Sequence, residues 1–307
     1  MPFLPALLFA LQVTTPAPAP VDDAAAPLVT VTGERLTKAE VEARASGYVR
    51  AVLATPAYDQ FARWHEPVCL KLSGITDAAG ARVAARLAAI AGDAGAQWGK
   101  PGCRPNLQVV FSEDAAVTAG VIARRKPKQI SRLTGAERDR LLREPLPVRF
   151  WHALEMRSAD GVAGGVNASA ALSSAQSGGG TPLGNVLPGD APSFDSRDPS
   201  LIKTTIAVWI TSAVVIVDVG LANGKSLDSV ADYVGMVSLA PLRLPPVPPA
   251  VPSVLSLFAP AGAESPAAGM TSWDRAFLSG LYSAVPNRSS QRQRGQIVAA
   301  ISADLAR

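Results

Sequence analysis

The chain of 307 residues contains only two histidines, His65 and His152, so few side chains could exchange protons near neutral pH. A serine hydrolase would need one of them with a carboxylate, and Asp218 is the best-placed candidate because it ends the most apolar segment. Structural roles compete with this interpretation. His152 fits a half-buried core histidine, and His65 fits a surface partner of Glu66. Asp218 fits a strand-end cap or a loop acceptor, and we favour these structural roles.

Motifs with established chemistry are missing from the sequence. It has no GxGxxG after a strand, no P-loop, no GxSxG, no CxxC and no HExxH. Two histidines also exclude a zinc site built mainly of imidazoles. A two-cysteine metal site would need further ligands, and His65 is the only histidine close in sequence to Cys69 and Cys103. We therefore expect neither a metal nor a cofactor.

One helical segment resembles a known metal-binding motif. Residues 231–239, ADYVGMVSL, resemble the zincin helix A-H-E-L-G-H-x-x-G/L. Asp232 and Met236 stand at the two histidine positions, and Tyr233 stands at the glutamate position. Residues 272–282 are similar to the next helix of small secreted bacterial zincin-like proteins of unknown function. The resemblance implies a zincin-like scaffold without its metal site, because Asp and Met cannot replace two imidazoles on zinc and Tyr cannot act as the base.

A broader resemblance covers most of the chain. Segments around Cys69, at 105–107 and at 231–239 resemble a family of uncharacterised exported bacterial proteins, from residue 35 to the end. This family implies no known activity. The alternative for residues 226–240 is an ordinary amphipathic helix, with one apolar stripe and with Asp232, Tyr233 and Met236 facing solvent or a groove.

Capping signals and hydrophobic periodicity locate the elements around these residues. Capping boxes at 37–40 and 134–137 begin two helices, and residues 67–111 have the pattern of a β–α–β unit. The run 206–217 is apolar and β-branched, which predicts a central strand, or two consecutive strands, buried on both faces. The other predicted elements are strands at 67–72, 107–111 and 148–156 and helices that begin near residues 76, 113, 226, 271 and 289.

These elements predict an α+β fold, with a mixed β-sheet and packed helices in one main domain. Residues 1–30 are predicted to be a signal peptide and a Pro/Ala-rich linker, and 31–157 an N-terminal α/β portion. Residues 158–200 are predicted to be a flexible Gly/Ser-rich loop, and 201–307 a C-terminal portion with the buried strand and three helices. Two lobes separated by the 158–200 loop are the alternative.

Charge and cysteine content indicate the environment of the protein. The net charge is +4, and the basic stretch 124–128 has no aromatic residue near it, which argues against nucleic-acid binding. The apolar segment 3–11 is too short to cross a bilayer and fits the hydrophobic part of a signal peptide, although no basic residue precedes it. Cys69 and Cys103 predict a disulfide in an oxidising compartment, closing a loop of about 35 residues worth roughly 4 kcal/mol. Two buried free thiols are the alternative.

The sequence therefore favours an exported protein, periplasmic or extracellular, that binds a partner without catalysis. The partner would be an unknown peptide or a component of the cell envelope, and the candidate groove comprises Asp232, Tyr233, Met236 and Asp218. One alternative is a metal-independent hydrolase that uses His152 or His65. Another is a structural envelope protein held at the membrane by residues 3–11, if that segment is not cleaved.

Overall fold

The computed structural model describes residues 36–158, 206–260 and 267–306, which belong to one compact unit. The predictions for residues 1–30 and for nearly all of 158–200 lie outside these described residues. Strands from before and after 159–205 pair in the same sheet, so the two portions share one core instead of forming two lobes. In the described part of the chain, no helix is long and apolar enough to cross a membrane.

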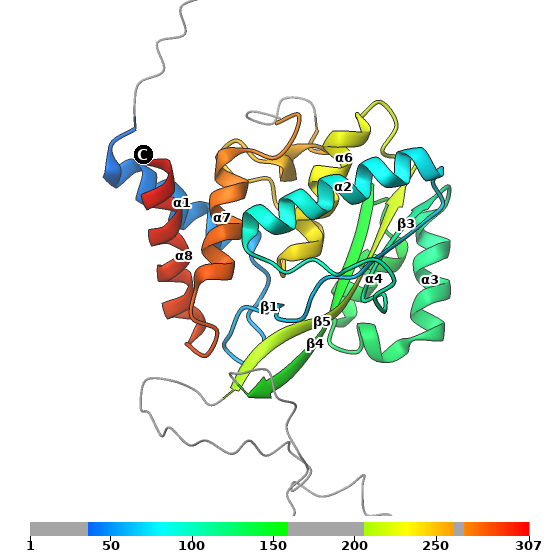
Figure 1. Cartoon of the computed structure of the whole chain (residues 1–307), viewed down its shortest axis with the longest axis horizontal. Coiled ribbons are helices and arrows are strands. Elements are labelled where there is room, and N and C mark those ends of the chain that lie inside the picture. Colours follow the sequence, from blue (N-terminus) through cyan, green and yellow to red (C-terminus); the bar gives the residue numbers. More distant parts are fainter. Residues whose placement is uncertain (1–35, 159–205, 261–266, 307) are drawn as a thin grey trace, which may run out of the picture. The chain divides into compact units, whose positions relative to one another are not determined.

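A five-stranded mixed sheet lies at the centre of this unit (Figure 1). The long strand β5 has β4 antiparallel along one edge, and β1 and β3 in tandem, both parallel, along the other. Beyond β3, the parallel strand β2 extends the sheet. The predicted α+β fold with a mixed sheet is therefore confirmed. The strands are β1 (Arg63–Trp64), β2 (Leu70–Ser73), β3 (Leu107–Ser112), β4 (Val148–Ser158) and β5 (Ile206–Asp218).

The strand β5 is continuous and carries the predicted central run. Residues 207–210 and 213–217 are buried, and only Thr211, Ser212 and the two ends are half-buried. A β-branched, apolar run is favourable here because neighbouring elements cover both faces of the sheet. The prediction of a buried central strand is confirmed, as a single strand.

Helices cover the two faces of the sheet (Figure 1). Five α-helices and the short η2 pack with the strands in the main hydrophobic cluster, and α3, η1 and α4 supply a smaller cluster on the opposite face. The capping boxes predicted at Thr37 and Thr134 are confirmed, because each threonine accepts a hydrogen bond from the amide three residues later. The helices are α1 (Lys38–Val52), α2 (Asp77–Ala94), α3 (Ala115–Arg125), α4 (Gly135–Arg143), α6 (Leu227–Leu239), α7 (Ser272–Ser283) and α8 (Ser290–Leu305), with short η1 (Pro127–Ile130) and η2 (Val254–Ser256).

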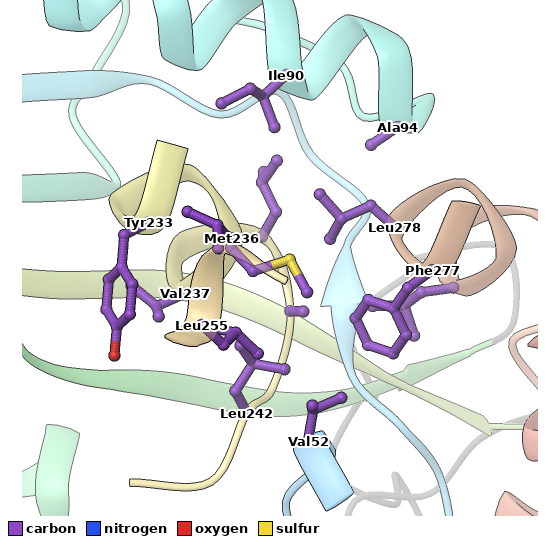
Figure 2. Packing of buried hydrophobic residues seen from close by; sticks show 14 of the residues in the cluster. Val52, Ile90, Ala94, Tyr233, Met236, Val237, Leu242, Leu255, Phe277 and Leu278 are labelled. Carbon is purple, nitrogen blue, oxygen red and sulfur yellow. The ribbon is translucent and has the colours of Figure 1, made fainter. Parts of the chain in front are cut away.

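The helix α6 is buried on all sides. Every residue from Ser229 to Leu239 is buried, and α2, α7, η2 and the sheet surround the helix (Figure 2). The prediction of an amphipathic helix with one apolar stripe is therefore wrong for this segment. Its small residues allow close packing: a Cβ added at Gly235 would lie 2.7 Å from Cδ1 of Ile90 in α2.

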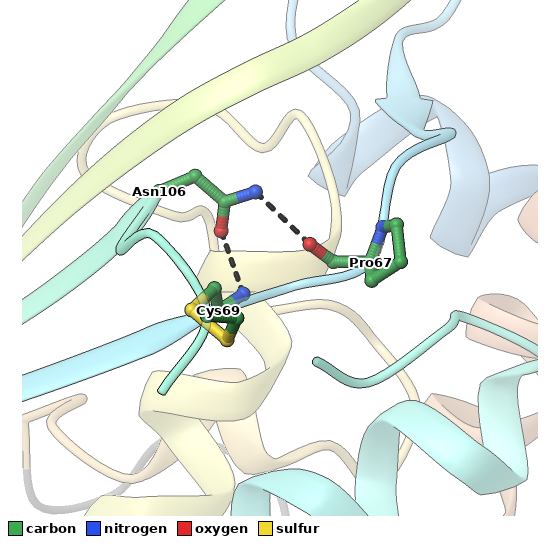
Figure 3. Close-up of a disulfide and its surroundings, with 4 residues drawn as sticks. Pro67, Cys69 and Asn106 are labelled. Carbon is green, nitrogen blue, oxygen red and sulfur yellow. Dashed lines mark hydrogen bonds between the residues drawn. A yellow bond between two sulfur atoms is a disulfide. The ribbon is translucent and has the colours of Figure 1, made fainter. Parts of the chain in front are cut away.

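A disulfide joins Cys69, directly before β2, to Cys103 in the loop before β3 (Figure 3). The predicted pairing is confirmed, with the Cα atoms 6.0 Å apart. Asn106 supports the same junction, because its Oδ1 accepts from the Cys69 N–H at 2.7 Å and its amide donates to the Pro67 carbonyl at 3.0 Å. The main chain at Gly99 packs directly against the disulfide, because a Cβ added at this position would lie 2.6 Å from the Cys103 sulfur. The bridge thus links the starts of two neighbouring parallel strands.

Candidate functional site

Asp232 of α6 is an ion-pair residue at the interface between α6 and α2. Its side chain is 1% exposed, and each carboxylate oxygen accepts a hydrogen bond from the Arg86 guanidinium. The main-chain N–H of Met270 donates a third hydrogen bond, at 2.7 Å. One turn earlier on both helices, Arg82 and Asp228 form the same bidentate pair at the surface. The Asp232 carboxylate is therefore occupied by structural partners.

The other two residues at the zincin positions also lie in the packed core. Met236 is fully buried and reaches toward Phe277 and Leu278 of α7, whereas Tyr233 lies on the other side of α6 (Figure 2). The Tyr233 ring packs edge-on against Phe258, with centroids 5.0 Å apart, and burial raises the pKa of its hydroxyl. These side chains do not form the floor of an open groove in the described part of the molecule.

Asp218 acts as an acceptor at the end of β5. Its Oδ1 accepts from the Leu221 N–H at 3.0 Å, which closes the turn after the strand. Its Oδ2 accepts from the Ala115 N–H at 3.3 Å, at the start of α3, where a carboxylate interacts favourably with the helix dipole. The side chain therefore ties the β5 turn to α3, as its structural interpretation predicts.

His65 lies on the surface next to β1. Its exposed ring stacks on Trp209 of β5, with the centroids 4.5 Å apart and the planes tilted by 33°. The neighbouring carboxylate, Glu66, forms its ion pair with Arg157 of β4. His65 is thus a stacking partner of an aromatic ring, and Glu66 belongs to a separate ion pair.

The three residues that a hydrolase could use are far apart. His152 lies opposite Ala213 in the sheet, and Asp218 follows Ala213 by five positions, a separation of roughly 16 Å along a strand. His65 follows Trp64, which pairs with Ile210 nearer the other end of β5. The fold does not bring these two histidines and Asp218 together.

A pocket of about 340 Å³ lies beside the edge strand β4, and the sequence did not predict it. Four separate segments of the chain build its wall, and the one motif among them, the capping box at 134–137, marks the start of a helix and not a binding site. The one sequence signal was His152, the single polar residue on the otherwise apolar face of a strand. The pocket is lined by residues 54–57 and 60–62 after α1, 132–134 and Glu137 at the start of α4, 150–152 and Leu154 of β4, and 241, 242 and 244 after α6.

His152 gives this pocket its buried polar group. Among the described residues, its Nε2 has no hydrogen-bond partner, although almost no surface of this atom reaches solvent. Burial lowers the pKa of the imidazole to about 4, and this outweighs the raising effect of the nearby carbonyls of Ser238 and Val237. His152 is therefore neutral at neutral pH and adds an uncharged polar ring to the wall of the pocket.

The edge of β4 that pairs with no described strand borders the same pocket, and Phe150 is 3% exposed there. The carbonyls of Pro147 and Ala153 accept hydrogen bonds from Asp218 and Thr211, so these odd-numbered positions point toward β5. Main-chain groups alternate in direction along a strand, so Phe150 and His152 turn their N–H and C=O groups away from β5. Within the described residues, β4 pairs with no strand other than β5. Two pocket residues thus present outward main-chain donors and acceptors.

The helix α4, whose start forms part of the pocket wall, is fixed to β4 at its C-terminal end by a buried arginine. Arg149 is 2% exposed, and its guanidinium donates to the main-chain carbonyls of Leu141 and Glu144 at 2.6 and 2.5 Å. A cation at this position also stabilises the negative end of the helix dipole. Arg149 therefore holds α4 beside the edge strand and helps to define the pocket.

In the described ranges, no group of three or more His, Cys, Asp or Glu side chains could hold a metal ion. Comparisons of the whole chain found no matching family model, no matching curated protein and no matching solved structure. The resemblances noted from the sequence therefore stay hypotheses, and the function must be argued from the site itself.

Proposed function

We propose that this protein is an exported, non-catalytic module that binds an extended peptide along the edge of β4. The observation that carries the proposal is the coincidence of the pocket with the unpaired strand edge: Phe150 and His152 line the pocket and also turn main-chain groups away from β5. An extended segment can pair with such an edge while one of its side chains enters the adjoining pocket.

The lining of the pocket suits an apolar side chain with a polar tip. Phe150, Leu154, Leu242 and Leu244 supply apolar surface, and the neutral imidazole of His152 adds polar surface. A volume of about 340 Å³ is at the lower end of the range for ligand sites and is sufficient for one large side chain. Main-chain pairing would provide affinity, and the pocket would select one residue of the peptide.

The disulfide supports the proposed location outside the cytoplasm. Cys69 and Cys103 are the only cysteines of the chain, and they pair with each other. Disulfides of this kind persist in oxidising compartments and are rare where thiols are kept reduced. A peptide-binding module in such a compartment would meet envelope proteins or exported peptides.

The test is selection of linear peptides from a displayed random library with the full chain. Amide exchange measured by mass spectrometry then compares the free protein with its complex. We expect slower exchange for the segment of β4 that contains Phe150 and His152, because their amides would be hydrogen-bonded only in the complex. A bound peptide that leaves exchange in β4 unchanged would place the binding site elsewhere and contradict the proposal.

A pair of tryptophan variants tests the pocket itself. Thr55→Trp adds a large ring at an exposed position of the pocket wall, whereas Ala250→Trp adds the same ring at an exposed position outside it. We expect the first change to weaken peptide binding at least about tenfold and the second to leave it unchanged. Cleavage of the bound peptide, abolished by His152→Gln, would instead support the metal-independent hydrolase.

A further inference from the structure

An arginine–tyrosine pair stands at the rim of the pocket. The Arg132 guanidinium lies over the Tyr58 ring, 4.6 Å from its centroid, and its Nη1 donates to the Tyr58 hydroxyl at 2.9 Å. Both side chains are exposed, Tyr58 by 51%. Stacking and one hydrogen bond hold the guanidinium in a defined plane, while its remaining N–H groups stay available for a bidentate partner.

The turn that carries Tyr58 is strained and firmly anchored. Tyr58 and Asp59 have φ angles of 50° and 57°, in the left-handed region that residues with a Cβ rarely adopt. Ser290 of α8 holds the turn in place: its N–H donates to the Asp59 carbonyl at 2.6 Å and its hydroxyl donates to the Asp59 carboxylate. Strain maintained by surrounding contacts is typical of binding sites, and here it presents a tyrosine at the pocket rim.

Cations outnumber carboxylates around this pair, where the nearby acids are Asp59 and Glu137. In the described part of the chain, no carboxylate lies within ion-pair distance of Arg132. The nearby Glu137 uses one carboxylate oxygen to accept from both the amide and the hydroxyl of Thr134, as part of a capping box. The same flank of β4 has further exposed cations that form no ion pair with described residues, namely Arg124, Arg125, Lys126, Lys128 and Arg138.

We infer that the Arg132–Tyr58 pair binds a carboxylate side chain of the peptide, so that the partner is an acidic extended segment of a protein. This inference rests on the proposed function and specifies its ligand. Arg132 binds the Asp or Glu carboxylate bidentately, and the Tyr58 ring covers the apolar part of the same side chain. The other cations on this flank raise the association rate of an acidic segment.

The composition of peptides selected by the full chain is the first test. We expect enrichment of Asp or Glu at a fixed spacing from an apolar residue, and weaker binding when sodium chloride is raised from roughly 50 to 500 mM. Replacing the acidic residue of the selected peptide by its amide should weaken binding about three- to tenfold. Peptides that bind along β4 without acidic enrichment would overturn this inference and leave the proposed function standing.

Paired arginine variants separate recognition from general charge. Arg132→Gln should weaken binding of the acidic peptide about three- to tenfold and should not affect the amide-substituted peptide. Arg138→Gln removes an exposed cation of the same flank that does not line the pocket, and it should change affinity less than about twofold. Equal effects of the two variants would overturn the role of Arg132, even with peptide binding intact.

Sedimentation with anionic vesicles of phosphatidylglycerol is the remaining test. If the basic flank served a membrane surface, the full chain would sediment with these vesicles, and no linear peptide would be selected. That outcome would overturn both the inference and the proposed function. A protein that selects no peptide and binds no vesicle would overturn both as well, because the pocket would then have no extended ligand.

Discussion

Substituting Asp232 by Asn tests whether this position of α6 is structural. The change preserves the shape of the side chain and removes its charge. In the native protein one carboxylate oxygen accepts from Arg86, and the other accepts from both Arg86 and the Met270 amide. The amide of Asn supplies only one acceptor, so its NH₂ group must face a guanidinium or a main-chain N–H. One donor, on Arg86 or on the Met270 main chain, then loses its partner.

The size of the expected loss of stability follows from the burial of Asp232 and Arg86. Breaking a fully buried ion pair costs about 3–5 kcal/mol. Asp232 is 1% exposed but Arg86 is 41% exposed, so water can solvate the cation after the change. We therefore expect Asp232→Asn to lower the free energy of unfolding by about 2–4 kcal/mol.

The surface pair one turn away provides a matched control. Asp228 and Arg82 form the same bidentate contact on the same two helices, with exposed fractions of 43% and 65%. Surface ion pairs contribute little to stability, so we expect Asp228→Asn to change it far less than Asp232→Asn. Urea denaturation of the two variants and the native protein, followed by circular dichroism with the disulfide intact, measures the difference.

Equal losses of unfolding free energy for Asp232→Asn and Asp228→Asn would refute this reasoning. The contribution of each ion pair to stability would then not depend on its burial. A loss below about 1 kcal/mol for Asp232→Asn, with an unchanged denaturant slope, would refute it as well. It would mean that the carboxylate of α6 is not needed for packing, and a ligand-binding role for Asp232 would regain support.

Three other predictions concern the disulfide, the pocket histidine and two glycines. Replacing Cys69 and Cys103 by Ala should destabilise the protein by up to about 4 kcal/mol in thermal unfolding, since the bridge closes a loop of about 35 residues; a reductant should then leave the variant unaffected. His152 has a pKa of about 4 in the folded protein and about 6.5 in the unfolded chain. Its neutral form therefore adds to the free energy of unfolding above pH 6.5, and this stabilisation is lost as the pH falls from 6.5 towards 4. Between pH 7.5 and 5 the native protein should lose about 2 kcal/mol more than His152→Gln, and parallel pH profiles would contradict this. Gly47→Ala should stabilise α1 by about 0.5–1 kcal/mol, because an added Cβ meets nothing within 4 Å. Gly74→Ala should cost at least about 2 kcal/mol, because φ is +76° and the Cβ would collide with a main-chain carbonyl; similar melting temperatures for the two glycine variants would contradict both predictions.

Local signals in the sequence were sufficient for most of the elements. The hydroxyls of Thr37 and Thr134 accept from the third helical amide, and this interaction needs only four consecutive residues. The strand β5 was recognisable because a β-branched apolar run is stable only between two covered faces. Cys69 and Cys103 were the only possible partners for each other, and the fold decided between a bridge and two free thiols by placing their Cα atoms 6.0 Å apart.

The surroundings of α6 could not be predicted from its own residues. A helix with Asp232 and Tyr233 is expected to expose one face, unless a partner neutralises the acid. That partner, Arg86, lies 146 positions away. The equal spacing of Arg82 and Arg86 and of Asp228 and Asp232 was the signal in the sequence, because it places two complementary pairs one helical turn apart.

The sequence by itself determined the α+β class, the central strand and most helix starts, because these depend on short-range periodicity, capping and composition. Only the tertiary structure decided which polar side chains are buried and where a pocket lies. It placed Asp232, Tyr233 and Met236 in the core, and it opened a pocket at the edge of β4 instead. The physical reason is that a pocket is space left between elements, and its wall comes from chain segments that meet only after the sheet and its covering helices have packed.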